Sequence, residues 1–198
     1  MKINLYELNQ TNGGTDFSAN DNAEVGIVNA VCHTYDLDSR GGSVGFDPTY
    51  DRIINNSKIE IKVSKHKTPF IEIAKGDGSI TGLSISKSDL YMFVNPGAVK
   101  INGDWINMMK VRIVHTQELK NWITHMIEKH PDDYVEFKPS KLGKGSGGFY
   151  LEWSAVDDLF LLGFDYDLDA HGNIVFDTHK IIMPNNEYAF KVISNFIK

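Results

Sequence analysis

Short stretches in which branched or aromatic residues alternate with polar ones occupy the middle of the chain. Residues 50–54 and 58–63 show this alternation, which predicts two strands, because a strand turns every second side chain to the same face. Asn55, Asn56 and Ser57 between them are typical of a hairpin turn, so we expect the two strands to pair antiparallel. Further strands are expected over residues 3–8, 69–74, 90–94 and 111–114.

Apolar residues recur every three or four positions in four other segments, which predicts helices packed against a core. The clearest can be capped by Thr116 and must end before Pro131. Asp21 and Glu24 have the spacing of a capping box at the start of another. This mixture predicts an α/β or α+β fold with a mixed central sheet. The other helices are expected over residues 23–35, 154–162 and 186–197.

The composition is that of a globular protein rather than a disordered, fibrous or membrane-spanning one. Of 198 residues, 41% are hydrophobic and 23% are charged. The longest apolar runs, such as residues 159–164, are far shorter than a transmembrane helix. The first 12 residues contain no apolar segment of a secretion signal, and the single cysteine, Cys32, cannot form an internal disulfide. We therefore expect a soluble, cytoplasmic, single-domain protein without a membrane partner.

Charge is distributed unevenly along the chain. The formal net charge of -6 argues against a protein that coats nucleic acid non-specifically. Residues 58–75 nevertheless contain five lysines and only two acids. Residues 138–148 are also basic and rich in glycine, and form either a flexible loop or a loop that contacts phosphate. The basic stretch over residues 58–75 indicates either a site for an anion or a hairpin with lysines on its solvated face.

The hairpin carries the most informative group of side chains. Alternation places Glu60 and Lys62 on the same face of one strand, and the turn can bring Asp51 near them from the other. Two carboxylates beside a lysine are costly unless a divalent cation lies between them, and oxygen ligands suit Mg²⁺ or Mn²⁺. Lys62 is then placed to orient a water molecule for attack on a phosphodiester.

This arrangement, Asp51-x8-Glu60-x-Lys62 across a hairpin, resembles the PD-(D/E)xK nuclease superfamily, which includes restriction endonucleases, Holliday-junction resolvases and many phage nucleases. The resemblance covers roughly residues 20–123, although Tyr50 stands where proline is frequent. It extends to Glu24 on a preceding helix and Glu72 on a following strand. A segment of small residues, an Asp-aromatic strand and a strand-to-helix step follow at residues 82–88, 89–94 and 111–126.

The resemblance implies a restriction-endonuclease-like fold, a mixed central sheet flanked by helices. The core then spans about residues 20–127, and residues 128–198 elaborate the same domain. It also implies a Mg²⁺- or Mn²⁺-dependent DNA endonuclease of a kind that phages encode. DNA is the expected partner, and a homodimer is one way to cut both strands of a duplex.

Particular roles follow from the resemblance. Asp51 and Glu60 would ligate the metal with the Ile61 carbonyl, and Lys62 would orient the attacking water or stabilise the transition state. Glu24 would reach the metal directly or through water, unless it serves only the capping box. Glu72 faces either the metal or solvent.

Two basic or hydroxyl-rich segments near the motif are candidates for contact with the DNA backbone. Lys65, His66 and Lys67 follow the motif and form either a phosphate contact or a solvated turn. Ser86 and Lys87 either touch phosphate or cap the start of the next strand. A second function remains open, namely a non-catalytic module with the nuclease fold that binds DNA or inhibits a host enzyme. The net negative charge and the acidic ends of the chain favour that alternative.

Overall fold

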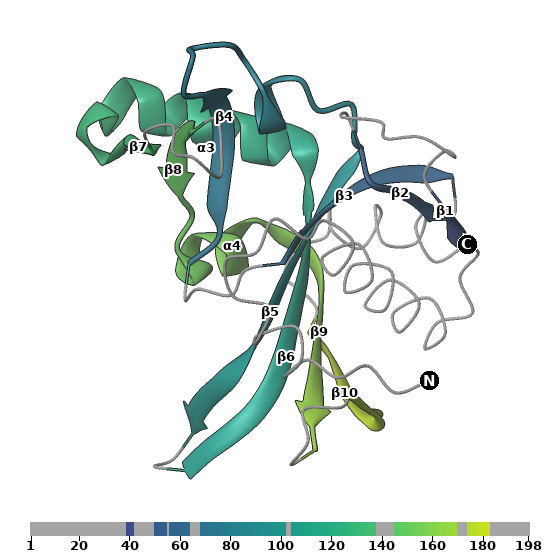
Figure 1. Cartoon of the computed structure of the whole chain (residues 1–198). Coiled ribbons are helices and arrows are strands. Elements are labelled where there is room, and N and C mark those ends of the chain that lie inside the picture. The colour runs from purple at the N-terminus through teal and green to yellow at the C-terminus, as the bar shows by residue number, and fades with distance from the viewer. Residues whose placement is uncertain are drawn as a thin grey trace.

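The computed structural model describes residues 39–41, 50–54, 56–63, 68–101, 104–137, 145–169 and 174–182 (Figure 1). Within these ranges it contains two β-sheets and two α-helices, which confirms the expected mixture of strands and helices. The strand expected over residues 3–8 and the helices expected over residues 23–35 and 186–197 lie outside the described residues. None of the helices that the structure describes is long and apolar enough to cross a membrane.

The larger sheet has seven strands and is mixed in direction. In spatial order they are β1 (Ser39–Gly41), β2 (Arg52–Ile54), β3 (Ser57–Val63), β5 (Leu90–Ile101), β6 (Asp104–His115), β9 (Phe160–Leu168) and β10 (Ile174–Ile182). Neighbouring strands run antiparallel, except that β3 and β5 are parallel. Strands β5 and β6 extend well beyond the short segments predicted for them and form a long hairpin (Figure 1).

A smaller sheet consists, in order, of β4 (Phe70–Lys75), β8 (Ser146–Tyr150) and β7 (Val135–Phe137). The strand predicted over residues 69–74 is therefore present, but it pairs with β8 and lies outside the larger sheet. The reason is topological, since β3 and β5 are parallel and the chain between them must leave the sheet to cross over. Strand β4 and the 3₁₀-helix η1 (Gly82–Ser84) lie in that crossover.

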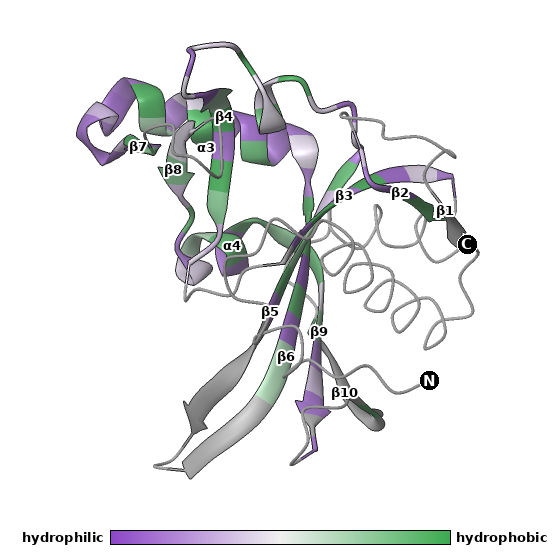
Figure 2. Cartoon of the chain, viewed as in Figure 1, coloured by the Kyte–Doolittle hydropathy of each residue, from purple (hydrophilic) through white to green (hydrophobic). Residues whose placement is uncertain are grey.

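The helix α3 (Thr116–Lys129) confirms the helix predicted to end before Pro131. Its N-cap is His115 rather than Thr116, because the His115 Nδ1 accepts a hydrogen bond from the Gln117 N–H at 3.2 Å. Figure 2 shows hydrophobic and hydrophilic residues on different sides of this helix. The buried residues Leu119 and Ile123 belong to the apolar side. The 3₁₀-helix η2 (Pro131–Asp133) follows.

The helix expected over residues 154–162 is wrong in its last three residues. The helix α4 spans only Trp153–Leu159, and β9 begins at Phe160. A short apolar run such as residues 159–164 suits a buried strand as well as a helix. The segment from Phe160 forms a strand because it pairs with β6. Strand β9 is followed by the antiparallel strand β10, which the hydrophobic pattern did not predict.

The predicted hairpin of β2 and β3 is confirmed, with Arg52 opposite Ile59 and Ile54 opposite Ser57. Asn56 in the turn has a φ of 68°, the left-handed region that asparagine tolerates better than most residues. The local sequence therefore determines the register of this hairpin. The register in turn determines which side chains of β3 point to each face of the sheet.

The core next to this hairpin lies between the larger sheet and the elements that cover one of its faces. Tyr91, Phe93 and Val114 of the larger sheet belong to it. The covering elements contribute buried residues from α3, α4 and the smaller sheet, namely Leu119, Ile123, Val156, Ile71 and Phe149. Since Glu60 is opposite Tyr91 and Lys62 is opposite Phe93, both charged side chains point to this same face.

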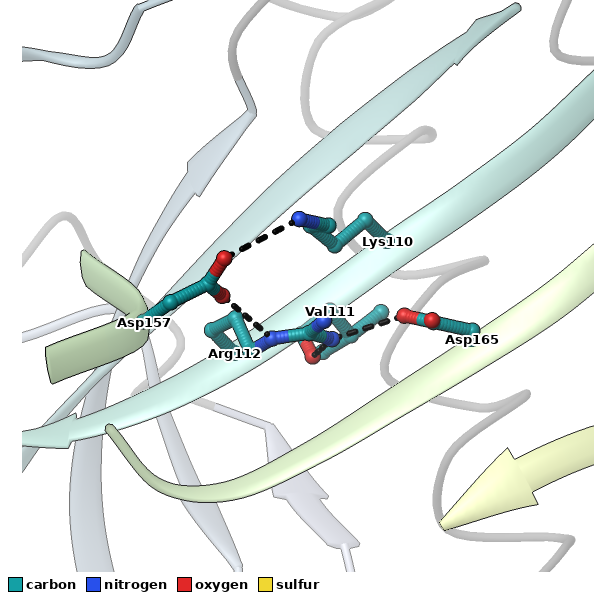
Figure 3. Close-up of polar contacts among 5 residues, drawn as sticks. All are labelled: Lys110, Val111, Arg112, Asp157 and Asp165. Carbon is teal, nitrogen blue, oxygen red and sulfur yellow. Dashed lines mark hydrogen bonds and ion pairs between the residues drawn. The ribbon is translucent and has the colours of Figure 1, made fainter. Parts of the chain in front are cut away.

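A buried charged cluster ties α4 to the same face of the larger sheet (Figure 3). The Arg112 side chain is 5% exposed and donates to Asp157 on α4 at 3.0 Å and to Asp165 on β9 at 2.7 Å. Lys110 also contacts Asp157, at 3.3 Å. The absence of a side chain at Gly163 makes room for Arg112, since a Cβ there would lie 2.9 Å from the Arg112 Cδ.

Candidate active site

Glu60 and Lys62 lie on β3 and form an ion pair between the Lys62 Nζ and the Glu60 Oε1. The Glu60 side chain is 11% exposed and that of Lys62 is 38% exposed, so the carboxylate is buried and the Lys62 side chain is partly exposed. The prediction that these residues share a face is therefore confirmed.

Asp51 joins them from the residue just before β2. Its backbone N–H donates to the Ile59 carbonyl at 2.9 Å, and its Oδ2 accepts a hydrogen bond from the Ile61 N–H at 2.6 Å. The carboxylate thus continues the hydrogen-bond ladder of the hairpin by one step beyond the end of β2. This anchors it on the backbone between Glu60 and Lys62.

The Ile61 carbonyl points to the same edge of β3 as the Asp51 carboxylate. The N–H and C=O of one strand residue point to the same side, and the Ile61 N–H is directed at Asp51. Strand β2 pairs with β3 only as far as Ile59, so the carbonyl lies beyond the paired part of the hairpin. A carbonyl oxygen and two carboxylates therefore gather around one point of β3.

Burial and neighbouring charge act together on the two ionisable groups of β3. Burial raises the pKa of the Glu60 carboxyl, the Lys62 ammonium partly offsets this, and the Asp51 carboxylate raises the pKa further. Burial works to lower the pKa of Lys62, but the carboxylates of Glu60 and Asp51 outweigh it, so its pKa is raised. Lys62 consequently stays protonated at neutral pH and is paired with Glu60.

Tyr91 is a residue at this site that sequence reasoning missed. It is the register partner of Glu60 on β5 and is 1% exposed. Burial is the main cause that raises the pKa of its hydroxyl to about 12, with a smaller contribution from Glu60. The hydroxyl therefore remains protonated. No local pattern could have identified it, because alternation along β5 does not show that β5 pairs with β3.

Ser86 and Lys87 lie where the chain approaches β5. The Ser86 hydroxyl is buried and contacts the Ser88 hydroxyl at 2.7 Å, and Ser88 contacts the Thr116 hydroxyl at 3.1 Å. This chain of hydroxyls joins the start of β5 to the start of α3, which agrees with the capping alternative. Lys87 is exposed, and its contact with phosphate stays a prediction.

Glu72 is in a different sheet from Glu60 and Lys62. It lies on β4 and is paired with Gly148 on β8. The side chain of the preceding residue, Ile71, packs into the core, so Glu72 points to the other face of the smaller sheet. Its role in a metal site stays a prediction. Four other candidates, Glu24, Lys65, His66 and Lys67, lie outside the described residues.

The oxygen atoms gathered at β3 fit a hard divalent cation. Mg²⁺ usually binds one or two carboxylates and keeps several waters, which matches Asp51, Glu60 and the Ile61 carbonyl. In the part of the chain that the structure describes, no three His, Cys, Asp or Glu side chains form a metal-binding group. A Mg²⁺ or Mn²⁺ site at these residues therefore stays a prediction.

Comparison of the chain with protein-family models, curated proteins and solved structures gives no match.

The raised pKa of Glu60 predicts a pH-dependent stability of the metal-free protein. Between the ordinary range of a glutamate and the raised pKa, the folded protein binds more protons than the unfolded chain. The stability of the wild type relative to Glu60→Gln should therefore fall as the pH rises through this window. Urea denaturation in EDTA at several pH values measures the difference.

Glu128→Gln, at an exposed position on α3, is the matched control and should show no such trend. A difference between wild type and Glu60→Gln that stays constant from mildly acidic to neutral pH contradicts the assignment.

Proposed function

We propose that this protein is a Mg²⁺- or Mn²⁺-dependent nuclease that hydrolyses phosphodiester bonds in DNA. The observation that carries the proposal is the convergence of Asp51, Glu60 and Lys62 on one hairpin. The Asp51 carboxylate is held by the Ile61 N–H, and the Glu60 carboxylate is paired with Lys62. A buried Glu60 next to a second carboxylate is unfavourable for stability, so the arrangement is best explained by a ligand of positive charge.

Each residue has a distinct part in the proposed reaction. Asp51, Glu60 and the Ile61 carbonyl hold the cation, which supplies Lewis-acid activation of the scissile phosphate and a lowered pKa of water. Lys62, which is protonated and 38% exposed, orients the attacking water or stabilises the negative charge that develops on the phosphate. Tyr91 lies opposite Glu60 on the neighbouring strand.

The arrangement of elements supports a restriction-endonuclease-like core. The hairpin with the three residues is followed by a crossover to the parallel strand β5, and β6 leads directly into α3. The order of hairpin, Asp-aromatic strand and strand-to-helix step is the one expected from the resemblance, except that β4 belongs to a second sheet. The parallel pairing of β5 was not part of that expectation.

A plasmid assay tests the proposal. Supercoiled DNA should be nicked or linearised by the wild type with Mg²⁺ or Mn²⁺ and stay intact in EDTA. Branched and single-stranded DNA are tested in parallel, because the site does not define the shape of the substrate. Failure to cut any of these substrates with either metal contradicts the nuclease.

Metal binding can be measured separately by the rise in melting temperature with Mn²⁺ or Ca²⁺, since a ligand of the folded state stabilises it. Asp51→Asn is the variant of choice, because its amide oxygen can still accept the Ile61 N–H. It should abolish the rise. If the wild type binds no metal and cuts no DNA, the non-catalytic module is the better account of this fold.

A further inference from the structure

Three aromatic rings form a cluster on the outer face of the smaller sheet. Phe70 on β4 contacts Phe137 on β7 with ring centroids 5.2 Å apart and Tyr150 on β8 at 5.4 Å, both edge to face. Phe137 is 42% exposed and Tyr150 is 39% exposed. The neighbouring residues in the opposite phase, Ile71 and Phe149, pack into the core. We call the surface formed by Phe70, Phe137 and Tyr150 the aromatic face.

Positive charge lies next to the aromatic face. Ser146 is the register partner of both Phe137 and Lys75, so these two residues flank the same position of β8. Lys75 is exposed. Glu72 adds a negative charge to the same strand, between Phe70 and Lys75.

Exposed rings beside lysines are the surface that unpaired bases and their phosphates require. Every base has a flat π-face that stacks on an aromatic side chain, while cationic groups follow the backbone. Duplex DNA cannot use such rings, because its bases are already stacked on one another. A purely apolar partner would leave Lys75 without a function.

We propose that the aromatic face binds a single-stranded segment of nucleic acid by base stacking, with Lys75 at its backbone. This inference rests on the proposed nuclease function and names its substrate class, DNA with an unpaired segment such as a flap, a gap or a branch. Strand β3, which carries Glu60 and Lys62, ends at Val63, and β4 begins at Phe70. The connection between them spans at most about 25 Å, which limits the distance between the ends of the two strands.

Fluorescence anisotropy with a labelled oligothymidylate of about 16 nucleotides tests the aromatic face. The titrations are done in EDTA, so that cleavage cannot interfere. Phe137→Ala and Tyr150→Ala should each weaken binding by at least about fivefold, whereas Tyr150→Phe keeps the ring and should bind like the wild type. Lys75→Gln should weaken binding and lower its dependence on salt.

Ile127→Ala removes an exposed apolar side chain from α3 and serves as the control for loss of surface area. Melting curves establish that each variant is folded. Binding of a blunt, fully paired duplex should be unchanged in the alanine variants.

Three results would overturn the inference. The first is that the wild type fails to bind the oligothymidylate. The second is that the alanine variants bind it as tightly as the wild type does. The third is that light scattering shows the wild type to be a dimer and the alanine variants to be monomers. The last result identifies the aromatic face as an interface between two copies of this chain.

Failure here is distinguishable from failure of the nuclease. Ring-dependent binding of the oligothymidylate without cleavage of any DNA supports the aromatic face and rejects hydrolysis. Metal-dependent cleavage with unchanged binding in Tyr150→Ala supports hydrolysis and rejects the aromatic face.

Discussion

Lys62→Ala is expected to reduce DNA cleavage by about 10²- to 10³-fold, while the protein remains folded. The Lys62 ammonium stays protonated because the carboxylates of Glu60 and Asp51 raise its pKa. The Lys62 side chain is 38% exposed. Alanine removes the group that orients water or stabilises charge in the transition state, and leaves the proposed metal ligands in place.

The measurement is a single-turnover cleavage assay with Mg²⁺, accompanied by the melting temperature and the affinity for Mn²⁺. Lys58→Ala is the matched control, because Lys58 lies on the same strand and packs its amine over the Tyr50 ring at 5.2 Å. Its backbone N–H donates to Asp89 and is unaffected by the substitution. Cleavage by Lys62→Ala at the rate of Lys58→Ala would remove Lys62 from the mechanism.

The part of the site that could be predicted from sequence is the part held by local structure. Asn56 sets the turn, the turn sets the register of β2 and β3, and alternation along β3 then places Glu60 and Lys62 on one face. The hydrogen bond from the Ile61 N–H to Asp51 follows from the same register. These are interactions between residues about ten positions apart, which a hydrophobic pattern and turn chemistry can define.

The remainder depends on contacts between distant segments. Tyr91 reaches the site only because β5 pairs parallel to β3, and a pattern of alternation does not identify the partner of a strand. The same holds for β4, which alternates like a strand of the larger sheet but pairs with β8. At Phe160 the apolar run fits either a helix or a strand, and pairing with β6 selects the strand.

Arg112→Ala is expected to lower the free energy of unfolding by about 3–5 kcal/mol. Arg112 joins α4 to β9 through Asp157 and Asp165, and its guanidinium also lies over the Phe160 ring at 5.3 Å (Figure 3). Removing the cation leaves Asp165, whose side chain is only 16% exposed, without its partner. An unpaired buried charge costs far more than the loss of a surface ion pair.

Urea denaturation measures the effect, and Asp157→Asn provides a graded comparison. The Asp157 side chain is 40% exposed, so its loss should cost no more than about 1 kcal/mol. A loss of less than about 1 kcal/mol in Arg112→Ala would show that the cluster does not hold α4 on the sheet.

Phe93 lies between Arg112 and Lys62 along one row of the larger sheet, with each residue opposite the next. The affinity of Arg112→Ala for Mn²⁺ well below its melting temperature should therefore match that of the wild type, which separates the stability of the fold from the chemistry at β3.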